Sequence, residues 1–229
     1  MIVDLECEAV LFDLDGVLVD SLGVAERILR DWAAEHGVDG DHAVALSHGR
    51  RDVDLIALLA PDLDVAAEVA WIVDREERAV DGITAMPGAL DLLAAVPPGR
   101  WAVVTSGARA VARARMGAAR LPEPAHLVAA EDVRRGKPDP EPYLRGARLL
   151  GVAAERCVVI EDAMSGVRAA LAAGMRCVGV GAEVVPSAVT LHVANLNELS
   201  AVVDGGVISL SATAASSRST RRSGAPHAG

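Results

Sequence analysis

Short apolar runs recur along the chain, and each ends in polar or small residues. The run Ala9 to Phe12 is continuously apolar and stops at aspartates, and Trp101 to Val104, Cys157 to Ile160 and Cys177 to Val180 share its character. An unbroken apolar run of this kind is typical of a parallel strand that is buried on both faces. The segment His126 to Val128 is a weaker example. We therefore expect these runs to form the strands of one parallel sheet.

Stretches rich in alanine, leucine and arginine separate the runs and have helical spacing. They cover Ala108 to Met116, Pro140 to Leu150 and Ser165 to Ala173, and Gly151 and Gly174 stand where the last two would end. Glycine is common just past a helix C-terminus because it adopts the left-handed conformation without strain. The alternation of strands and helices predicts an α/β fold with a doubly wound parallel sheet.

The stretch from about Val19 to Met86 breaks this alternation. It shows amphipathic helical patterns and no strand-like run, so we expect a small all-helical cap at residues 19–86, inserted into a core built from residues 1–18 and 87–203. The patterned segments are Val24 to His36, Asp52 to Leu59 and Ala66 to Arg78.

After Val203 the chain turns to Gly, Ser, Ala, Thr and Arg without periodicity. Such a composition buries too little apolar surface to offset the entropy of ordering, so residues 204–229 are predicted to be a disordered tail. The basic residues Arg218, Arg221 and Arg222 of this tail are expected to be solvated.

Charge and composition narrow the function classes. The chain has 32 acidic and 22 basic residues and a net charge of -10, which disfavours binding to nucleic acid or to an anionic membrane. The acidic N-terminus and the lack of a long apolar run argue against a signal peptide or a membrane span, and three cysteines without a CxxC pair fit a reducing compartment. We therefore expect a cytoplasmic protein, a monomer or weak dimer, whose partner is a small molecule.

Polar side chains follow the predicted strands at their carboxyl ends, where open α/β sheets bind ligands. In chain order they are Asp13, Asp15, Thr105, Ser106, Glu161 and Asp162. Carboxylates that converge on one crevice repel one another by ~4 kcal/mol per close pair at an effective dielectric of about 20, so a cation is implied. Oxygen ligands without histidine or cysteine point to Mg²⁺.

The residue types suggest roles in phosphoryl transfer. Asp13 fits a nucleophile, and Asp15 fits a general acid that protonates the leaving oxygen and then a base that activates water. Thr105 offers a hydroxyl, and Ser106 and Gly107 offer backbone N–H groups at the start of a helix, where phosphoryl oxygens are best held.

Lys137 is the only lysine in a chain with 21 arginines, and it lies in the loop Arg135 to Pro138 ahead of a predicted helix. An ammonium is a compact point charge, whereas a guanidinium is a broad planar fork. We predict that Lys137 binds the phosphoryl group and balances its charge in the intermediate.

Four segments together resemble the motifs of the haloacid dehalogenase-like hydrolases, in family order over about residues 8–200. The segments are Leu11 to Val17, Val103 to Gly107, Gly136 to Pro138 and Ile160 to Asp162. The resemblance implies a Rossmann-like core with an inserted helical cap. It also implies magnesium held by Asp13, the backbone carbonyl of Asp15 and Asp162, with Glu161 assisting directly or through water.

Within this family the chain looks most like the sugar- and polyol-phosphate phosphatases, on the segments Trp101 to Gly107, Ala130 to Val133 and Gly136 to Tyr143. The resemblance implies hydrolysis of a small phosphate monoester through an aspartyl-phosphate, with the cap selecting the substrate. Arg50 and Arg51 are the candidates for that cap contact.

Two alternatives stay open. Relatives of β-phosphoglucomutase carry a histidine early in the cap, about where Ala25 stands, so hydrolysis is favoured over a mutase reaction. A catalytically silent binding protein on the same scaffold is the other alternative, and metal-dependent turnover of an aryl phosphate would distinguish an enzyme from it.

Overall fold

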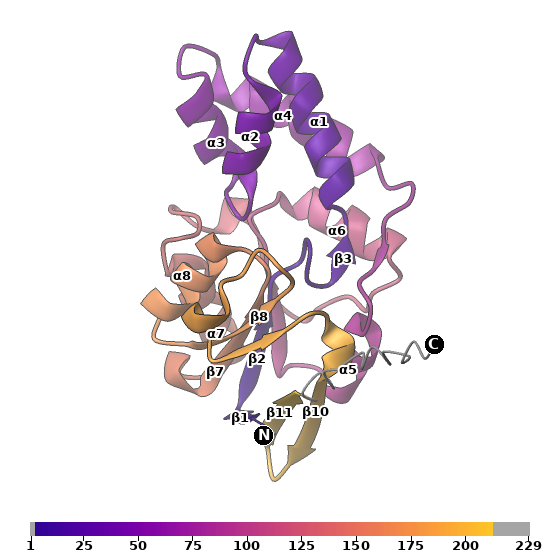
Figure 1. The fold of residues 1–229 in the computed structure, drawn as a ribbon, viewed down its shortest axis with the longest axis vertical. Helices are drawn as coiled ribbons and strands as arrows, with labels where there is room; N and C mark the ends of the chain where they lie inside the picture. Colours follow the sequence, from indigo (N-terminus) through magenta and orange to yellow (C-terminus); the bar gives the residue numbers. More distant parts are fainter. Residues whose placement is uncertain (1–2, 213–229) are drawn as a thin grey trace, which may run out of the picture.

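The computed structural model describes residues 3–212, and its largest element is a six-stranded parallel sheet (Figure 1). The strands follow the spatial order β6-β5-β2-β7-β8-β9. Each of the predicted apolar runs is a strand of this sheet, and β9 is the strand that the sequence did not predict. The bounds are β2 (Ala9–Phe12), β5 (Trp101–Val104), β6 (Leu127–Val128), β7 (Cys157–Glu161), β8 (Arg176–Val180) and β9 (Leu191–Val193).

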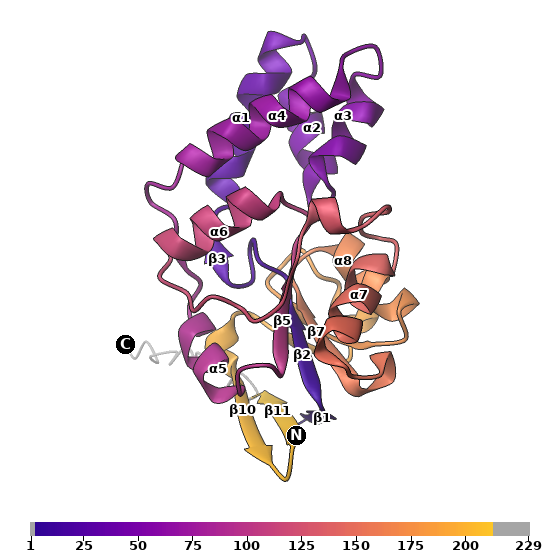
Figure 2. The same cartoon turned by 180° about the vertical axis from the view of Figure 1, so that it is seen from behind.

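Helices cover both faces of the sheet, as Figures 1 and 2 show. They are α5 (Ala89–Ala95), α6 (Arg109–Ala118), α7 (Glu141–Leu150) and α8 (Met164–Ala172). Val10 and Phe12 of β2 pack in the hydrophobic core shared with α5 and α6, whereas Ala9 and Leu11 pack in the core shared with α7 and α8. Successive side chains of a strand point to opposite faces, so a strand covered on both sides has an unbroken apolar sequence. The doubly wound α/β architecture is confirmed.

Residues 22–78, called the helical insert from here on, pack together beyond the carboxyl ends of the parallel strands (Figures 1 and 2). The helices are α1 (Leu22–Glu35), α2 (Gly40–Ser47), α3 (Asp52–Leu59) and α4 (Val65–Arg78). Helix α2 was not predicted from the sequence. The chain enters and leaves the insert through two short paired strands, β3 (Val19–Asp20) and β4 (Thr84–Ala85).

A second sheet has three antiparallel strands in the order β1-β11-β10. The strands are β1 (Val3–Cys7), β10 (Leu199–Asp204) and β11 (Val207–Ala212). The prediction of disorder from residue 204 onward is therefore wrong for residues 204–212. In β11 the buried Ile208, Leu210 and Ala212 alternate with exposed or partly exposed residues, a strand pattern that the surrounding serines and glycines hid. Residues 213–229, with the basic cluster predicted there, lie outside the described residues.

Short 3-10 helices complete the described chain. They are Ala130–Asp132, Ala154–Arg156, Pro186–Ala188 and Leu196–Glu198. Within residues 3–212, no helix combines the length and the hydropathy that crossing a bilayer requires.

Candidate active site

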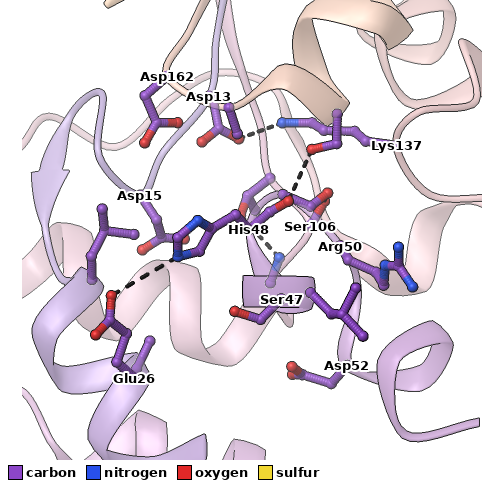
Figure 3. A pocket seen from close by; sticks show the side chains of 18 of the residues that line it. Asp13, Asp15, Glu26, Ser47, His48, Arg50, Asp52, Ser106, Lys137 and Asp162 are labelled. Carbon is purple, nitrogen blue, oxygen red and sulfur yellow. Dashed lines mark hydrogen bonds and ion pairs between the residues drawn. The ribbon is translucent and has the colours of Figure 1, made fainter. Parts of the chain in front are cut away.

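A cavity of about 490 Å³ lies between the carboxyl ends of the strands and the helical insert (Figure 3). Such a volume is in the range of a small-molecule site. Most of the predicted site residues line it, namely Asp13, Asp15, Arg50, Thr105, Ser106, Gly107, Lys137 and Asp162. Glu161 and Arg51, which were also predicted, do not.

Asp13 directly follows β2, and its backbone N–H donates to the carbonyl of Ile160 in β7. The residue is 7% exposed, and its carboxylate accepts a hydrogen bond through Oδ1 from the Nζ of Lys137. Figure 3 shows the lysine reaching across the cavity wall to this carboxylate. The nucleophile predicted from the sequence and the chain's only lysine are therefore direct neighbours.

The electrostatics of this pair reflect its burial. Burial raises the pKa of Asp13 to about 7, against the lowering effect of Lys137 and with further raising by Glu161 and Asp15. Burial lowers the pKa of Lys137, but the charges of Asp13 and Glu161 overcome this and hold it above its usual value. Lys137 thus stays protonated, and one ammonium does not neutralise all the carboxylates around it.

Asp162 supplies the second carboxylate on the wall of the cavity beside Asp13 (Figure 3). Carboxylate oxygens of Asp13, Glu161 and Asp162 lie within 4.8 Å of one another. Burial raises the pKa of Asp162, and the charges of Glu161 and Asp13 raise it further. Excess negative charge on hard oxygen donors fits a divalent cation, so these residues meet the chemical requirement for one.

Gly16 makes room for this carboxylate. Its φ of +84° is in the left-handed region, and a Cβ added there would lie 1.9 Å from Oδ2 of Asp162. Any side chain at this position would push Asp162 away from the loop that carries Asp13 and Asp15. Glycine is therefore required here both by the backbone conformation and by the close approach.

Glu161 is fully buried behind the cavity. Its Oε1 accepts hydrogen bonds from the Nζ of Lys137 at 2.6 Å and from the hydroxyl of Tyr143 at 2.8 Å, and its Oε2 accepts from the backbone N–H of Ala163 at 2.9 Å. With both oxygens occupied, the side chain holds Lys137 in place. That Glu161 assists the metal directly or through water, as the family resemblance implied, stays a prediction.

Asp15 is held by two donors on one oxygen. Oδ1 accepts from the hydroxyl of Ser21 at 2.5 Å and from Nη1 of Arg115 at 2.7 Å. Within residues 3–212, no hydrogen bond occupies Oδ2 of Asp15. A carboxylate fixed through one oxygen can present the other to a ligand, which suits proton transfer.

Arg115 connects the core to the helical insert. It comes from α6, is 3% exposed, and places Nη2 3.0 Å from Oε1 of Glu76 in α4. Burial raises the pKa of Glu76, against the lowering effect of Arg115 and with further raising by Asp15. A chain of charges thus runs from Asp15 through Arg115 to the insert.

Thr105 and Gly107 form the turn that follows β5 and precedes α6. The hydroxyl of Thr105 accepts from the backbone N–H of Gly107 at 3.0 Å. The hydroxyl of Ser106 donates to the carbonyl of Gly49 in the insert at 2.8 Å, and Ser165 donates in the same way to His48 at 3.0 Å. The turn that was predicted to bind phosphate therefore also holds the insert loop above it.

The two arginines predicted for substrate contact have different surroundings. Arg50 lines the cavity. Arg51 is 7% exposed and is used internally: Nε and Nη2 donate to Asp54 at 2.7 and 2.9 Å, and the guanidinium also donates to the carbonyls of Val133 at 2.8 Å and Arg134 at 3.0 Å. The structure thus separates them, with Arg51 linking the insert to the core loop and only Arg50 facing the cavity.

Several residues of the site were not predicted from the sequence. Asp52, Glu76 and Arg115 line the same cavity. Arg115 lies in an arginine-rich helix and Glu76 in a run of charged residues, so neither stands out in the sequence. Their meeting depends on how α4 packs on α6, which a local pattern does not encode.

The fold and the site together define the class of protein. The parallel sheet with helices on both faces matches the Rossmann-like core that the sequence resemblance implied, and the buried Asp13 lies at the end of a central strand of this sheet. Residues 7–174 match the family of haloacid dehalogenase-like hydrolases. The chain belongs to this family.

The chain is similar in sequence to phosphatases of known substrate and in structure to a solved member of the family. The chain is 45% identical to hexitol phosphatase A of Escherichia coli over 186 residues, 78% of this chain and 85% of that protein. It is 35% identical to glycerol-1-phosphate phosphohydrolase 1 of Saccharomyces cerevisiae over 191 residues, 77% of this chain and 75% of that protein. Among solved structures, CbbY from Rhodobacter sphaeroides in complex with phosphate superposes with a TM-score of 0.73 at 25% identity, covering 84% of this chain and 96% of that chain.

Proposed function

We propose that this protein is a Mg²⁺-dependent phosphatase that hydrolyses small sugar or polyol phosphate monoesters through an aspartyl-phosphate. The observation that carries the proposal is the buried contact between Asp13 and Lys137 at the wall of a cavity that also presents Asp162 and the Thr105 turn. The relatives named for hexitol and glycerol-1-phosphate support the substrate class.

The residues have distinct roles in this proposal. A carboxylate oxygen of Asp13 attacks phosphorus while Asp15, protonated on Oδ2, gives its proton to the leaving oxygen. Asp15 then takes a proton from the water that attacks the aspartyl-phosphate, which releases inorganic phosphate and restores Asp13. Thr105, the N–H group of Ser106 and Lys137 hold the phosphoryl oxygens, and the N–H of Gly107 joins them by exchanging its hydrogen bond to Thr105 for one to phosphate.

Asp13, Asp162 and the backbone carbonyl of Asp15 would hold Mg²⁺, which when bound offsets the negative charge that the carboxylates and the phosphate share. Glu161 keeps the ammonium of Lys137 aimed at Asp13. Because Lys137 is 3% exposed and Glu161 is fully buried, solvent and salt weaken the attraction between these two charges much less than they would at the surface.

We further propose that the helical insert is a cap domain that closes the cavity and excludes water. Its loop is fixed to the core through Ser106 and Ser165, and Arg51 ties it to the core segment Val133 to Arg134. Exclusion of water strengthens the electrostatic interactions inside the site and protects the intermediate until the leaving group has departed.

Hydrolysis is favoured over phosphomutase chemistry by Ala25. It lines the cavity at about the position where mutase relatives were expected to carry a histidine. A methyl group has no proton to exchange with a second substrate oxygen. Ala25 therefore cannot activate a second sugar hydroxyl to accept the phosphoryl group, and water does not compete with such an acceptor.

The proposal places the enzyme in the cytoplasm as a monomer or weak dimer. The cysteines, which are all buried and free, support the location but do not bear on the oligomeric state. Burial raises the pKa of Cys7 to about 12 and that of Cys157 to about 11, so these thiols are poorly suited to forming disulfides.

Release of inorganic phosphate tests the function. The purified protein would be assayed on hexitol, glycerol, sugar and aryl phosphates with Mg²⁺ and with a chelator, beside the Asp13→Asn variant. We expect metal-dependent release that is lost in the variant, whose fold is unchanged by circular dichroism. No metal-dependent release on any substrate would refute the proposal, and isomerisation of glucose 1-phosphate would favour the mutase.

A further inference from the structure

The end of the cavity formed by the helical insert carries polar groups that the hydrolytic mechanism does not use. Asp52 begins α3, and Figure 3 shows its carboxylate on the side of the cavity opposite Asp13 and Asp162. Within residues 3–212, it takes part in no hydrogen bond or ion pair, and it does not cap its own helix. A carboxylate beside a cavity with no partner from the protein is costly unless a ligand or water serves it.

Arg115 provides the second, independent observation. Of its five N–H donors, one is used in the hydrogen bond to Asp15, and Nη2 faces Glu76 as an ion pair outside hydrogen-bond geometry. Like Nη2, Nε exposes almost no surface and has no hydrogen-bond partner among the described residues. Arg115 lines the cavity, so this guanidinium is a buried cation beside the cavity with two of its three nitrogens without a hydrogen bond.

We propose that Asp52, Glu76 and Arg115 bind the hydroxyl groups of the substrate and select a neutral polyhydroxy chain over one that ends in an acid. This proposal rests on the proposed function. An alcohol hydroxyl both donates and accepts, so it can donate to Asp52 or Glu76 and accept from Arg115 at once.

A terminal carboxylate or second phosphate fits this end of the cavity poorly. It would bring only acceptors and negative charge toward Asp52, Glu76 and Asp15, and the guanidinium of Arg115 beside them already faces Asp15 and Glu76. Placing like charges close together in a shielded site is unfavourable. The same groups that accept a hydroxyl therefore reject an acid.

A matched pair of substrates tests the proposal. Sorbitol 6-phosphate and 6-phosphogluconate share the carbon chain and the phosphate, and differ at the far end in a CH₂OH or a carboxylate. We expect the kcat/KM of the native enzyme to be about 10-fold or more higher for the hexitol phosphate. The acid would leave charged or polar groups of the site without a suitable partner, and this is the size of effect that such unpaired groups produce. Asp52→Asn should reduce this preference, with a greater loss on sorbitol 6-phosphate than on an aryl phosphate that has no hydroxyl chain.

Control variants separate recognition from general damage. Asp62→Asn removes an exposed carboxylate of the same insert, and should leave the preference unchanged. Glu76→Gln, with the exposed neighbour Glu77→Gln as its control, repeats the test from α4. Thermal unfolding of every variant checks that it is folded.

The outcomes are distinct. An unchanged substrate ratio in both Asp52→Asn and Glu76→Gln, or equal losses on every substrate, would overturn the proposal. A native preference for 6-phosphogluconate would also overturn it and would point to Arg50 as the recognition residue. Absence of metal-dependent activity on all substrates, the aryl phosphate included, would instead refute the phosphatase function itself.

Discussion

Replacing Asp52 with asparagine is expected to stabilise the protein at neutral and alkaline pH. The carboxylate lines the cavity without a hydrogen-bond partner among the described residues. The pKa of Asp52 is raised from 3.8 to about 7. Burial is the main cause, the negative charges of Glu76 and Asp15 add to it, and the positive charge of Arg115 opposes it. A neutral amide of the same shape removes the cost of holding that charge in the folded state.

The pH dependence follows from the direction of the pKa change. Below about pH 4 the group is protonated in both the folded and unfolded chains, so it costs nothing. Between the two pKa values the unfolded chain releases its proton while the folded chain keeps it, and stability falls as pH rises. Above pH 7 both forms are ionised and the full cost persists, so the gain from Asp52→Asn is largest there.

The size of the gain can be bounded. The difference between pKa values of 3.8 and about 7 corresponds to at most ~4 kcal/mol, at ~1.4 kcal/mol per pKa unit. Water in the cavity screens the charge and Glu76 shares the proton, so we expect ~1–3 kcal/mol at pH 8.

Urea unfolding at pH 5 and pH 8, in the presence of a chelator, measures this gain. The exposed Asp62→Asn is the control and should change stability by less than ~0.5 kcal/mol. A destabilised Asp52→Asn variant, or a gain that is no larger at pH 8 than at pH 5, would refute the reasoning. A stabilised variant with impaired selectivity would identify Asp52 as a residue kept for function at the expense of stability.

Three further substitutions test the core of the site. Lys137→Met leaves buried carboxylates without their cation and should lower the unfolding free energy by ~3–5 kcal/mol at pH 8, measured in urea; a loss below ~1 kcal/mol would contradict the buried contact. Gly16→Ala should weaken Mg²⁺-dependent stabilisation and turnover, because its Cβ would lie 1.9 Å from Oδ2 of Asp162. Gly37→Ala is the control for backbone strain alone, since Gly37 has a φ of +66° and no atom within 4 Å of the added Cβ. Equal effects of the two substitutions on turnover would count against the steric argument. Asp15→Ala should reduce kcat/KM more for alkyl phosphates than for activated aryl phosphates, and equal losses would argue against its role as an acid.

The fold and the strand-end chemistry could be predicted from the sequence because both are local signals. An apolar run ending in Asp13 and Asp15 marks a buried parallel strand and its functional edge in the same few residues. Lys137 stood out because the chain has no other lysine. The antiparallel sheet was missed since β11 pairs with β1 from the opposite end of the described chain, and short alternating strands with serines carry a weak pattern.

The insert end of the site could not be predicted for a different reason. Arg51 was expected to reach substrate, but adjacent residues point to different surroundings at the start of a helix, and its guanidinium is taken up by Asp54 and by core carbonyls. Asp52, Glu76 and Arg115 come together only through the packing of α4 against both α3 and α6. Contacts of this kind depend on tertiary geometry, so residue type and spacing do not reveal them.

The central claim is that Asp13 carries the phosphoryl group during turnover. Acid quenching within the first turnover on sorbitol 6-phosphate, followed by mass spectrometry of the peptides, tests it most directly. The proposal predicts one phosphoryl group on the peptide that contains Asp13, absent after the Asp13→Asn substitution and absent when Mg²⁺ is chelated. A phosphoryl group on another residue, or turnover at the native rate in the Asp13→Asn variant, would contradict it.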